Sequence, residues 1–138
     1  MLRNSVLATL LIAASIPAWA FEVKPGLWET TSVMEGDQLP AELRQETIDQ
    51  HCMTAEAAQN PESAIRKDFN EAGFTNVDLS QSDDTISAKA SNSSAGQNVE
   101  IEISITKHSD EHTSSRSQVT SSETLVTTQE SRWVSEDC

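Results

Sequence analysis

The sequence predicts an α+β fold in which an antiparallel β-meander of about six to seven strands packs with one α-helix. Two observations carry this prediction. Residues 99–106 alternate between apolar and polar side chains, the pattern of a strand with one dry and one wet face. Residues 60–74 contain the start and stop signals of a helix, and short strand-like segments lie on either side of it. Strands with one wet face favour an antiparallel sheet.

The first 20 residues have the three parts of a cleavable signal peptide. Arg3 supplies the basic start, residues 6–16 form the apolar stretch, and Ala18-Trp19-Ala20 provides a small-x-small cleavage site. An apolar stretch of 11 residues is too short for a membrane-spanning helix, which needs about 20. We therefore expect export to the periplasm, cleavage after Ala20, no membrane insertion afterwards, and a single β-rich domain over residues 21–138.

The expected domain starts with two strands. Pro25-Gly26 forms a turn that leads into a first strand over Leu27–Met34, and Glu35-Gly36-Asp37 ends this strand. A polar loop through Leu39-Pro40 follows. The alternating residues 48–52 then predict a second, short strand that ends at Cys52.

The helix is predicted over Pro61–Ala72, and a proline suits its first position. Asn60 is a favourable N-cap residue, and Gly73 can adopt the positive φ that follows many helices. Phe69 and Phe74 have the spacing of the hydrophobic contact in a Schellman ending. The apolar stripe of this helix comprises Pro61, Ile65, Phe69 and Ala72.

Further strands are expected after the helix. Residues 77–79, 86–90 and 99–106 predict strands, with turns at Ser82-Asp83-Asp84 and at Asn92–Gly96. From residue 104 to 135, serine and threonine account for 15 of 32 residues, which fits either a disordered tail or further strands. Threonine is a good strand former and Trp133 lies close to the final cysteine, so we expect two more strands. Their turns are expected near Ser109-Asp110 and Ser122-Glu123.

The chain is strongly acidic, with a formal net charge of −13. Arg3 is the only charged residue among the first 20, so cleavage would leave a net charge of −14. Such a charge disfavours binding to a nucleic-acid backbone or to an anionic membrane surface. We expect the excess carboxylate to keep an exported protein soluble, and a docking surface for a basic partner is the alternative.

Cys52 and Cys138 are the only cysteines. An exported chain meets an oxidising compartment, so we expect a structural disulfide between them. A reactive thiol is the alternative, and it is disfavoured because there is no Cys-x-x-Cys motif and because two acids precede Cys138. A bridge between residues 86 positions apart would stabilise the fold by up to about 4–5 kcal/mol in the chain-entropy model.

Three segments resemble the exported bacterial proteins of domain of unknown function family 3617. They are Lys24-Pro25-Gly26-Leu27-Trp28-Glu29, the Cys-x-Thr-x-Glu segment Cys52–Glu56, and Arg132-Trp133 shortly before the C-terminal Cys138. The resemblance covers nearly all of the chain after residue 20. It implies an exported protein of the Gram-negative type, and it implies no particular reaction.

Two pairs of residues are candidates for a functional site. His108 and His112 flank an acidic turn and could bind zinc or copper, but without a third ligand we expect a solvated turn, no metal and no cofactor. Trp28 and Trp133 would either pack in a core that is poor in large side chains or line an apolar ligand pocket.

The sequence has no glycine-rich phosphate loop, nucleophile elbow or His-Glu-x-x-His zinc motif. We therefore expect a non-catalytic binding or interaction module whose partner is an envelope protein or a small apolar ligand. One alternative is an enzyme whose site the fold assembles from His51, His108 or His112 with carboxylates, and another is an envelope protein that binds an apolar ligand. Two of these histidines in one concave pocket with an acid would favour the enzyme, and scattered exposed histidines would favour the module.

Overall fold

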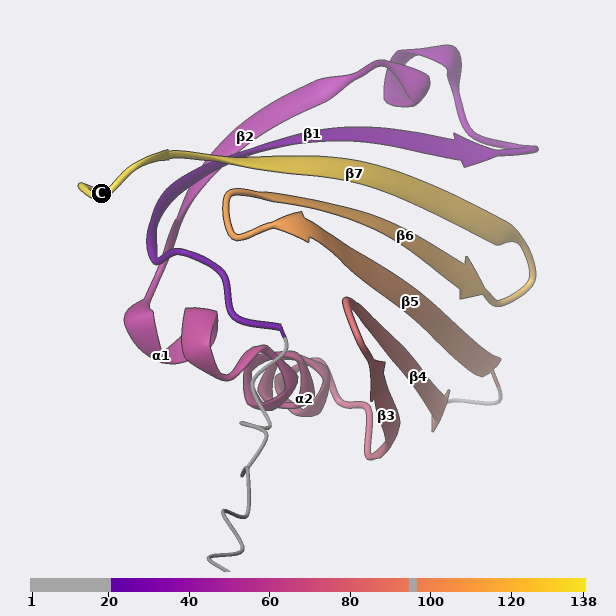
Figure 1. Cartoon of the computed structure of the whole chain (residues 1–138). Coiled ribbons are helices and arrows are strands. Elements are labelled where there is room, and N and C mark those ends of the chain that lie inside the picture. The colour runs from indigo at the N-terminus through magenta and orange to yellow at the C-terminus, as the bar shows by residue number, and fades with distance from the viewer. Residues whose placement is uncertain (1–20, 95–96) are drawn as a thin grey trace, which may run out of the picture.

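The computed structural model describes residues 21–94 and 97–138, which form one antiparallel sheet of seven strands with two helices on its concave side (Figure 1). The strands are β1 (Gly26–Gly36), β2 (Thr47–Met53), β3 (Asn76–Ser82), β4 (Thr85–Ser94), β5 (Gln97–Ser109), β6 (His112–Thr120) and β7 (Thr124–Ser135). The helices are α1 (Ala55–Gln59) and α2 (Pro61–Glu71), and the 3-10 turn η1 covers Ala41–Arg44. The predicted signal peptide and part of the predicted turn at 92–96 lie outside the described residues.

The strand order confirms the predicted antiparallel meander and adds one feature to it. Strands β3 to β7 are neighbours in chain order, whereas β1 lies between β2 and β7, giving the order β2-β1-β7-β6-β5-β4-β3. The strands β2 and β3, which are consecutive in the chain, therefore lie at opposite edges of the sheet. The chain between them must cross the concave side, and α1 and α2 are this crossing (Figure 1).

The predicted helix is present as α2, and its C-terminal end has the predicted Schellman geometry. The amide of Phe74 donates to the carbonyl of Phe69 at 2.9 Å, and the amide of Gly73 donates to the carbonyl of Asn70 at 3.1 Å. Gly73 has a φ of +93°, which glycine adopts without steric cost. The rings of Phe69 and Phe74 pack edge to face with centroids 5.8 Å apart.

The prediction of a single helix was wrong, because α1 precedes α2 directly. Thr54 starts α1, and its hydroxyl accepts a hydrogen bond from the amide of Ala57 at 3.2 Å. Asn60 lies at the N-cap position of α2, as predicted, but its side chain makes no capping hydrogen bond. Its backbone also ends α1, since its amide donates to the carbonyl of Glu56 at 2.9 Å.

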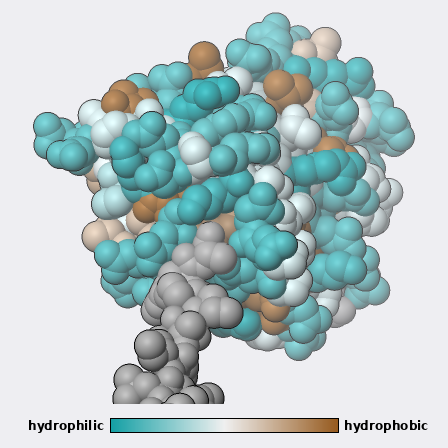
Figure 2. Space-filling view, in the orientation of Figure 1, coloured by the Kyte–Doolittle hydropathy of each residue, from teal (hydrophilic) through white to brown (hydrophobic). Residues whose placement is uncertain are grey.

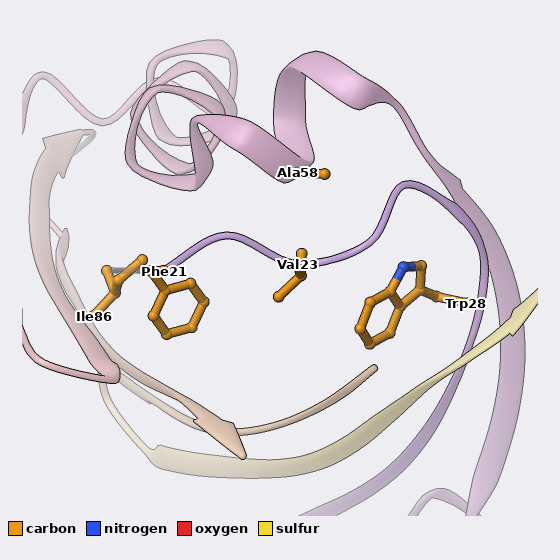
Figure 3. Close-up of a cluster of buried hydrophobic side chains, with 5 residues drawn as sticks. All are labelled: Phe21, Val23, Trp28, Ala58 and Ile86. Carbon is orange, nitrogen blue, oxygen red and sulfur yellow. The ribbon is translucent and has the colours of Figure 1, made fainter. Parts of the chain in front are cut away.

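The core consists of two clusters. The first contains Phe21, Val23, Trp28, Ala58 and Ile86, which lie between α1 and the concave face of the sheet (Figure 3). The second contains Phe69, Phe74, Ala88 and Ala90, and the partly buried Ile101 and Ile103 of β5 pack against it. The helix α2 therefore covers the half of the sheet formed by β3, β4 and β5.

Residues 21–25 run through the interior as a strap. Phe21 is 4% exposed, and the amide of Val23 donates to the carbonyl of Ala58 in α1 at 3.3 Å. The amide of Lys24 donates to the carbonyl of Asp110 in the turn between β5 and β6 at 2.9 Å. The amides of Val23 and Lys24 are thereby paired, and the side chains of Phe21 and Val23 are buried.

Two indoles hold the turn between the strap and β1. Trp28 is fully buried, and its indole nitrogen donates to the carbonyl of Lys24 at 2.8 Å. The indole nitrogen of Trp133 donates to the carbonyl of Pro25 at 3.0 Å, and the ammonium group of Lys24 lies 4.7 Å from the centroid of the Trp133 ring. That ammonium group also pairs with the Glu111 carboxylate, which raises the pKa of Lys24.

The disulfide between Cys52 and Cys138 lies beside this turn, with the two Cα atoms 5.6 Å apart. Cys52 on β2 and Ser135 at the end of β7 both pair with Leu27 of β1. The bridge therefore links the edge strand β2 to the C-terminus across β1.

We expect Gly26→Ala to destabilise the protein more than Gly73→Ala does, although both glycines have positive φ. A Cβ atom at Gly26, where φ is +131°, would overlap the backbone carbonyl oxygen of Ser135 and lie 3.0 Å from the indole nitrogen of Trp133. At Gly73 the nearest atom is 3.7 Å away, so that variant should lose only about 1–2 kcal/mol for its backbone conformation. Urea unfolding of both variants tests this, and equal losses would contradict it.

We expect Cys138→Ser to lower the free energy of unfolding by a few kcal/mol, because the bridge closes a loop of 86 residues around a thin core. Thermal unfolding with and without reductant measures the effect. Reductant should lower the melting temperature of the wild-type protein to that of the variant and leave the variant unchanged. An unshifted melting temperature for Cys138→Ser would show that the bridge does not support the fold.

Candidate ligand-binding site

A cavity of about 520 Å³ lies between the helices and the inner face of the sheet. Its walls come from the strap, the end of β2 and the two helices, and its floor comes from the inner faces of β1, β5, β6 and β7. The main apolar wall residues are Phe21, Val23, Met53, Pro61, Ala64 and Ile65. The polar floor residues are Thr30, Thr113, Ser115, Gln129 and Ser131.

The floor residues are connected by side-chain hydrogen bonds that cross three strands. The hydroxyls of Thr30 on β1 and Ser131 on β7 are 2.7 Å apart. The Ser115 hydroxyl on β6 donates to the amide oxygen of Gln129 at 3.2 Å, and the Gln129 amide nitrogen donates to the Ser32 hydroxyl at 3.2 Å. These bonds order the floor, while the hydroxyls retain capacity for a further bond.

The strand register explains why the interior beside β6, β7 and β1 is a cavity and not a packed core. Ile105 on β5 pairs with Ser115 on β6, which pairs with Gln129 on β7. The inner face thus changes from isoleucine to hydroxyl and amide side chains within two strands. Packing apolar helix residues directly onto these polar groups would cost free energy, because the groups would lose water without gaining partners.

Only two ionisable side chains line the cavity in the described part of the chain. They are His51 on β2 and Asp68 on α2, and both residues are exposed to solvent, so they lie at the open edge of the cavity. No lysine or arginine is among the described residues that line it.

The two tryptophans proposed from the sequence lie outside this cavity. Trp28 is fully buried in the first core cluster. Trp133 lines a second hollow of about 520 Å³ beside the disulfide, together with Lys24, Met53 and Cys138. In that hollow its ring is already covered by the Lys24 ammonium group.

His108 and His112 lie on the opposite face of the sheet from the cavity. Thr113 and Ser115 of β6 line the cavity, so His112 and Ser114, which alternate with them, face outward. The two imidazole rings have centroids 4.6 Å apart. His108 is hydrogen-bonded to the Ser114 hydroxyl at 2.7 Å, and His112 to the Glu130 carboxylate at 2.5 Å. The bond to His112 lowers the pKa of Glu130.

No group of three histidine, cysteine or acidic side chains within residues 21–94 and 97–138 is arranged to hold a metal ion. The fold thus brings the two histidines together, as the hairpin spacing allowed, but the Nε2 atom of each ring already has a hydrogen-bond partner. A third ligand does not join them in this part of the chain.

The model of the family DUF3617, described as a protein of unknown function, matches residues 23–138. The chain belongs to the DUF3617 family. This confirms the family that the sequence suggested, and the three segments that suggested it lie within the matched range. No curated protein and no solved structure matches the chain.

The sequence interpretation missed most of the residues that line the cavity of this DUF3617 protein. The signal was present in the alternation of β6 and β7, where Thr113, Ser115, Gln129 and Ser131 occupy every second position. A row of small polar residues on the face that should be core indicates an interior that is not packed. The pairing of these rows with Ile105 was needed to place them in the interior.

We expect zinc to leave the melting temperature of this protein unchanged, because two histidines whose Nε2 atoms already have hydrogen-bond partners do not form a full coordination set. Differential scanning fluorimetry with micromolar zinc measures this, with His108→Ala as the control. A saturable rise of several degrees that is lost in His108→Ala would contradict it and would indicate a metal site on the outer face.

Proposed function

We propose that this DUF3617 protein is a periplasmic binding protein that holds a small amphipathic molecule in its cavity and does not transform it. The observation that carries the proposal is the contrast between the two sides of the cavity. One side presents apolar side chains of the strap and helices, and the other presents hydroxyl and amide groups of the sheet. A molecule with an apolar body and a polar edge satisfies both sides at once.

The size of the cavity supports a small molecule as the ligand. Its volume of about 520 Å³ lies within the range of about 300–1,000 Å³ that is typical of small-molecule sites. The floor is preorganised by the hydrogen bonds among Thr30, Ser131, Ser115 and Gln129, so binding need not order it.

The distribution of histidines supports binding over catalysis. Of the three histidines considered for an enzyme, only His51 lines the cavity, while His108 and His112 lie on the outer face. Two histidines therefore do not share a concave pocket with an acid in the described residues. A general acid and a general base would have to be drawn from His51 and Asp68 alone.

The face of the molecule in Figure 2 favours a small-molecule ligand over a protein that would dock on this face. Figure 2 shows a predominantly hydrophilic face on which hydrophobic residues are separated from one another. Contiguous apolar patches are the usual mark of a protein-binding surface.

A periplasmic location is supported by the disulfide-bonded pair Cys52 and Cys138, since such bonds persist in oxidising compartments. The described helices are all too short or too polar to cross a bilayer. The signal peptide predicted over residues 1–20 completes this proposal.

We expect the neutral dye N-phenyl-1-naphthylamine to bind with a saturable rise in fluorescence, because the cavity offers an apolar wall. Ala64→Phe should weaken binding at least about tenfold, since a phenyl ring at this lining position occupies the space of the ligand. Ala55→Phe, at an exposed position in α1 that does not line the cavity, is the matched control and should bind normally.

Melting temperatures and circular dichroism of both variants show whether they are folded. Failure of the folded wild-type protein to bind the dye, or equal binding by Ala64→Phe, would refute the proposed function.

A further inference from the structure

We propose that the cavity selects amphipathic amines, with the apolar body against the helices and the ammonium group at the carboxylate of Asp68. This inference rests on the proposed function, since it names the chemical class of ligand for the same cavity. It depends on where Asp68 lies on α2 and on which charges surround it.

Asp68 continues the apolar stripe of α2 that faces the cavity. Pro61, Ala64, Ile65 and Asp68 follow one another at intervals of three or four residues, and all four line the cavity. A ligand that lies along this stripe with its apolar body on Ala64 and Ile65 brings its polar end to the Asp68 carboxylate. The stripe is therefore apolar at its N-terminal end and charged at its C-terminal end, and the proposed ligand has the same two parts.

The charge of Asp68 is not neutralised within the described residues. The ion pairs of these residues are Lys24–Glu111, Lys67–Glu71, Lys89–Glu102 and His112–Glu130, and none includes Asp68. Asp68 lies in the last turn of α2, which has no basic residue. The C-terminal end of a helix carries partial negative charge, so a carboxylate there is unfavourable and a cation beside it is stabilised.

The remaining lining also disfavours anions. A fatty acid carboxylate or a phosphate would face Asp68 without a lysine or arginine among the described lining residues to balance it. The net charge of −13 adds a long-range field that attracts cations and repels anions. The hydroxyl and amide oxygens of the floor can accept hydrogen bonds from the N–H groups of an amine.

Displacement of N-phenyl-1-naphthylamine by three eight-carbon compounds tests the inference. Octylammonium, 1-octanol and octanoate share one chain and differ in the charge of the head group. The measurements are made at pH 8, where an alkylamine is charged and octanoate is ionised. We expect octylammonium to displace the dye at the lowest concentration and octanoate at the highest.

Asp68→Asn should weaken octylammonium binding about fivefold, which is the effect of one ion pair near a protein surface, and leave octanol binding unchanged. Asp78→Asn on β3 removes the same charge at an exposed position that does not line the cavity, so it is the matched control and should change neither.

Two results would overturn the inference while the cavity remains a binding site. They are binding of octanoate as tight as that of octylammonium, and an unchanged preference in Asp68→Asn. If the wild-type protein binds neither the dye nor any of the three compounds, the proposed function fails and the inference fails with it.

Discussion

The pairing of β1 with β7 is the contact on which the rest of the structure depends. It joins the hairpin of β1 and β2 to the meander of β3 to β7, and it leaves β2 and β3 at opposite edges of one sheet. The chain between these edges has to cross the concave side, which creates a wall of two helices over the sheet (Figure 1). Two features stabilise one end of this strand pair. The indoles of Trp28 and Trp133 donate hydrogen bonds to the turn Lys24-Pro25-Gly26, and the disulfide lies beside this turn.

The inner face of the sheet has an apolar part and a polar part, and this division separates the packed core from the proposed binding site. Alanines of β4 and isoleucines of β5 pack together with Phe69 and Phe74. These two phenylalanines fill the space between α2 and the sheet. On β6, β7 and β1 the same face carries hydroxyl and amide groups that bond to one another. A core that is complete only on one side is thin, so the bridge between Cys52 and Cys138 supplies stability that a fully packed interior would otherwise provide.

The strap connects the two halves. Phe21 and Val23 belong to the first core cluster and also line the cavity (Figure 3). A ligand that contacts them would stabilise the folded state by mass action, because the cavity that they line exists only in the folded chain. The polar floor, in contrast, is held by hydrogen bonds within the sheet and belongs to no core cluster of the described residues. In the proposed binding mode, the strap would supply affinity, and the floor and Asp68 would supply selectivity.

The sequence alone determined the elements whose signals are local. Capping and glycine chemistry placed α2 and its Schellman ending at Gly73, and the alternation of residues 99–106 placed β5. The family was recognisable from Lys24–Glu29 and the cysteine-centred segments. The helix α1 was missed because five residues contain too little periodicity to distinguish them from a loop.

The cavity was decided only by the tertiary structure. Thr30, Ser115 and Ser131 are unremarkable strand residues until the pairing of β1 with β7 and of β5 with β6 places them on one floor. Asp68 is an ordinary helical acid until the crossing from β2 to β3 turns its face toward that floor. The position of these side chains depends on long-range strand register, which no local pattern specifies.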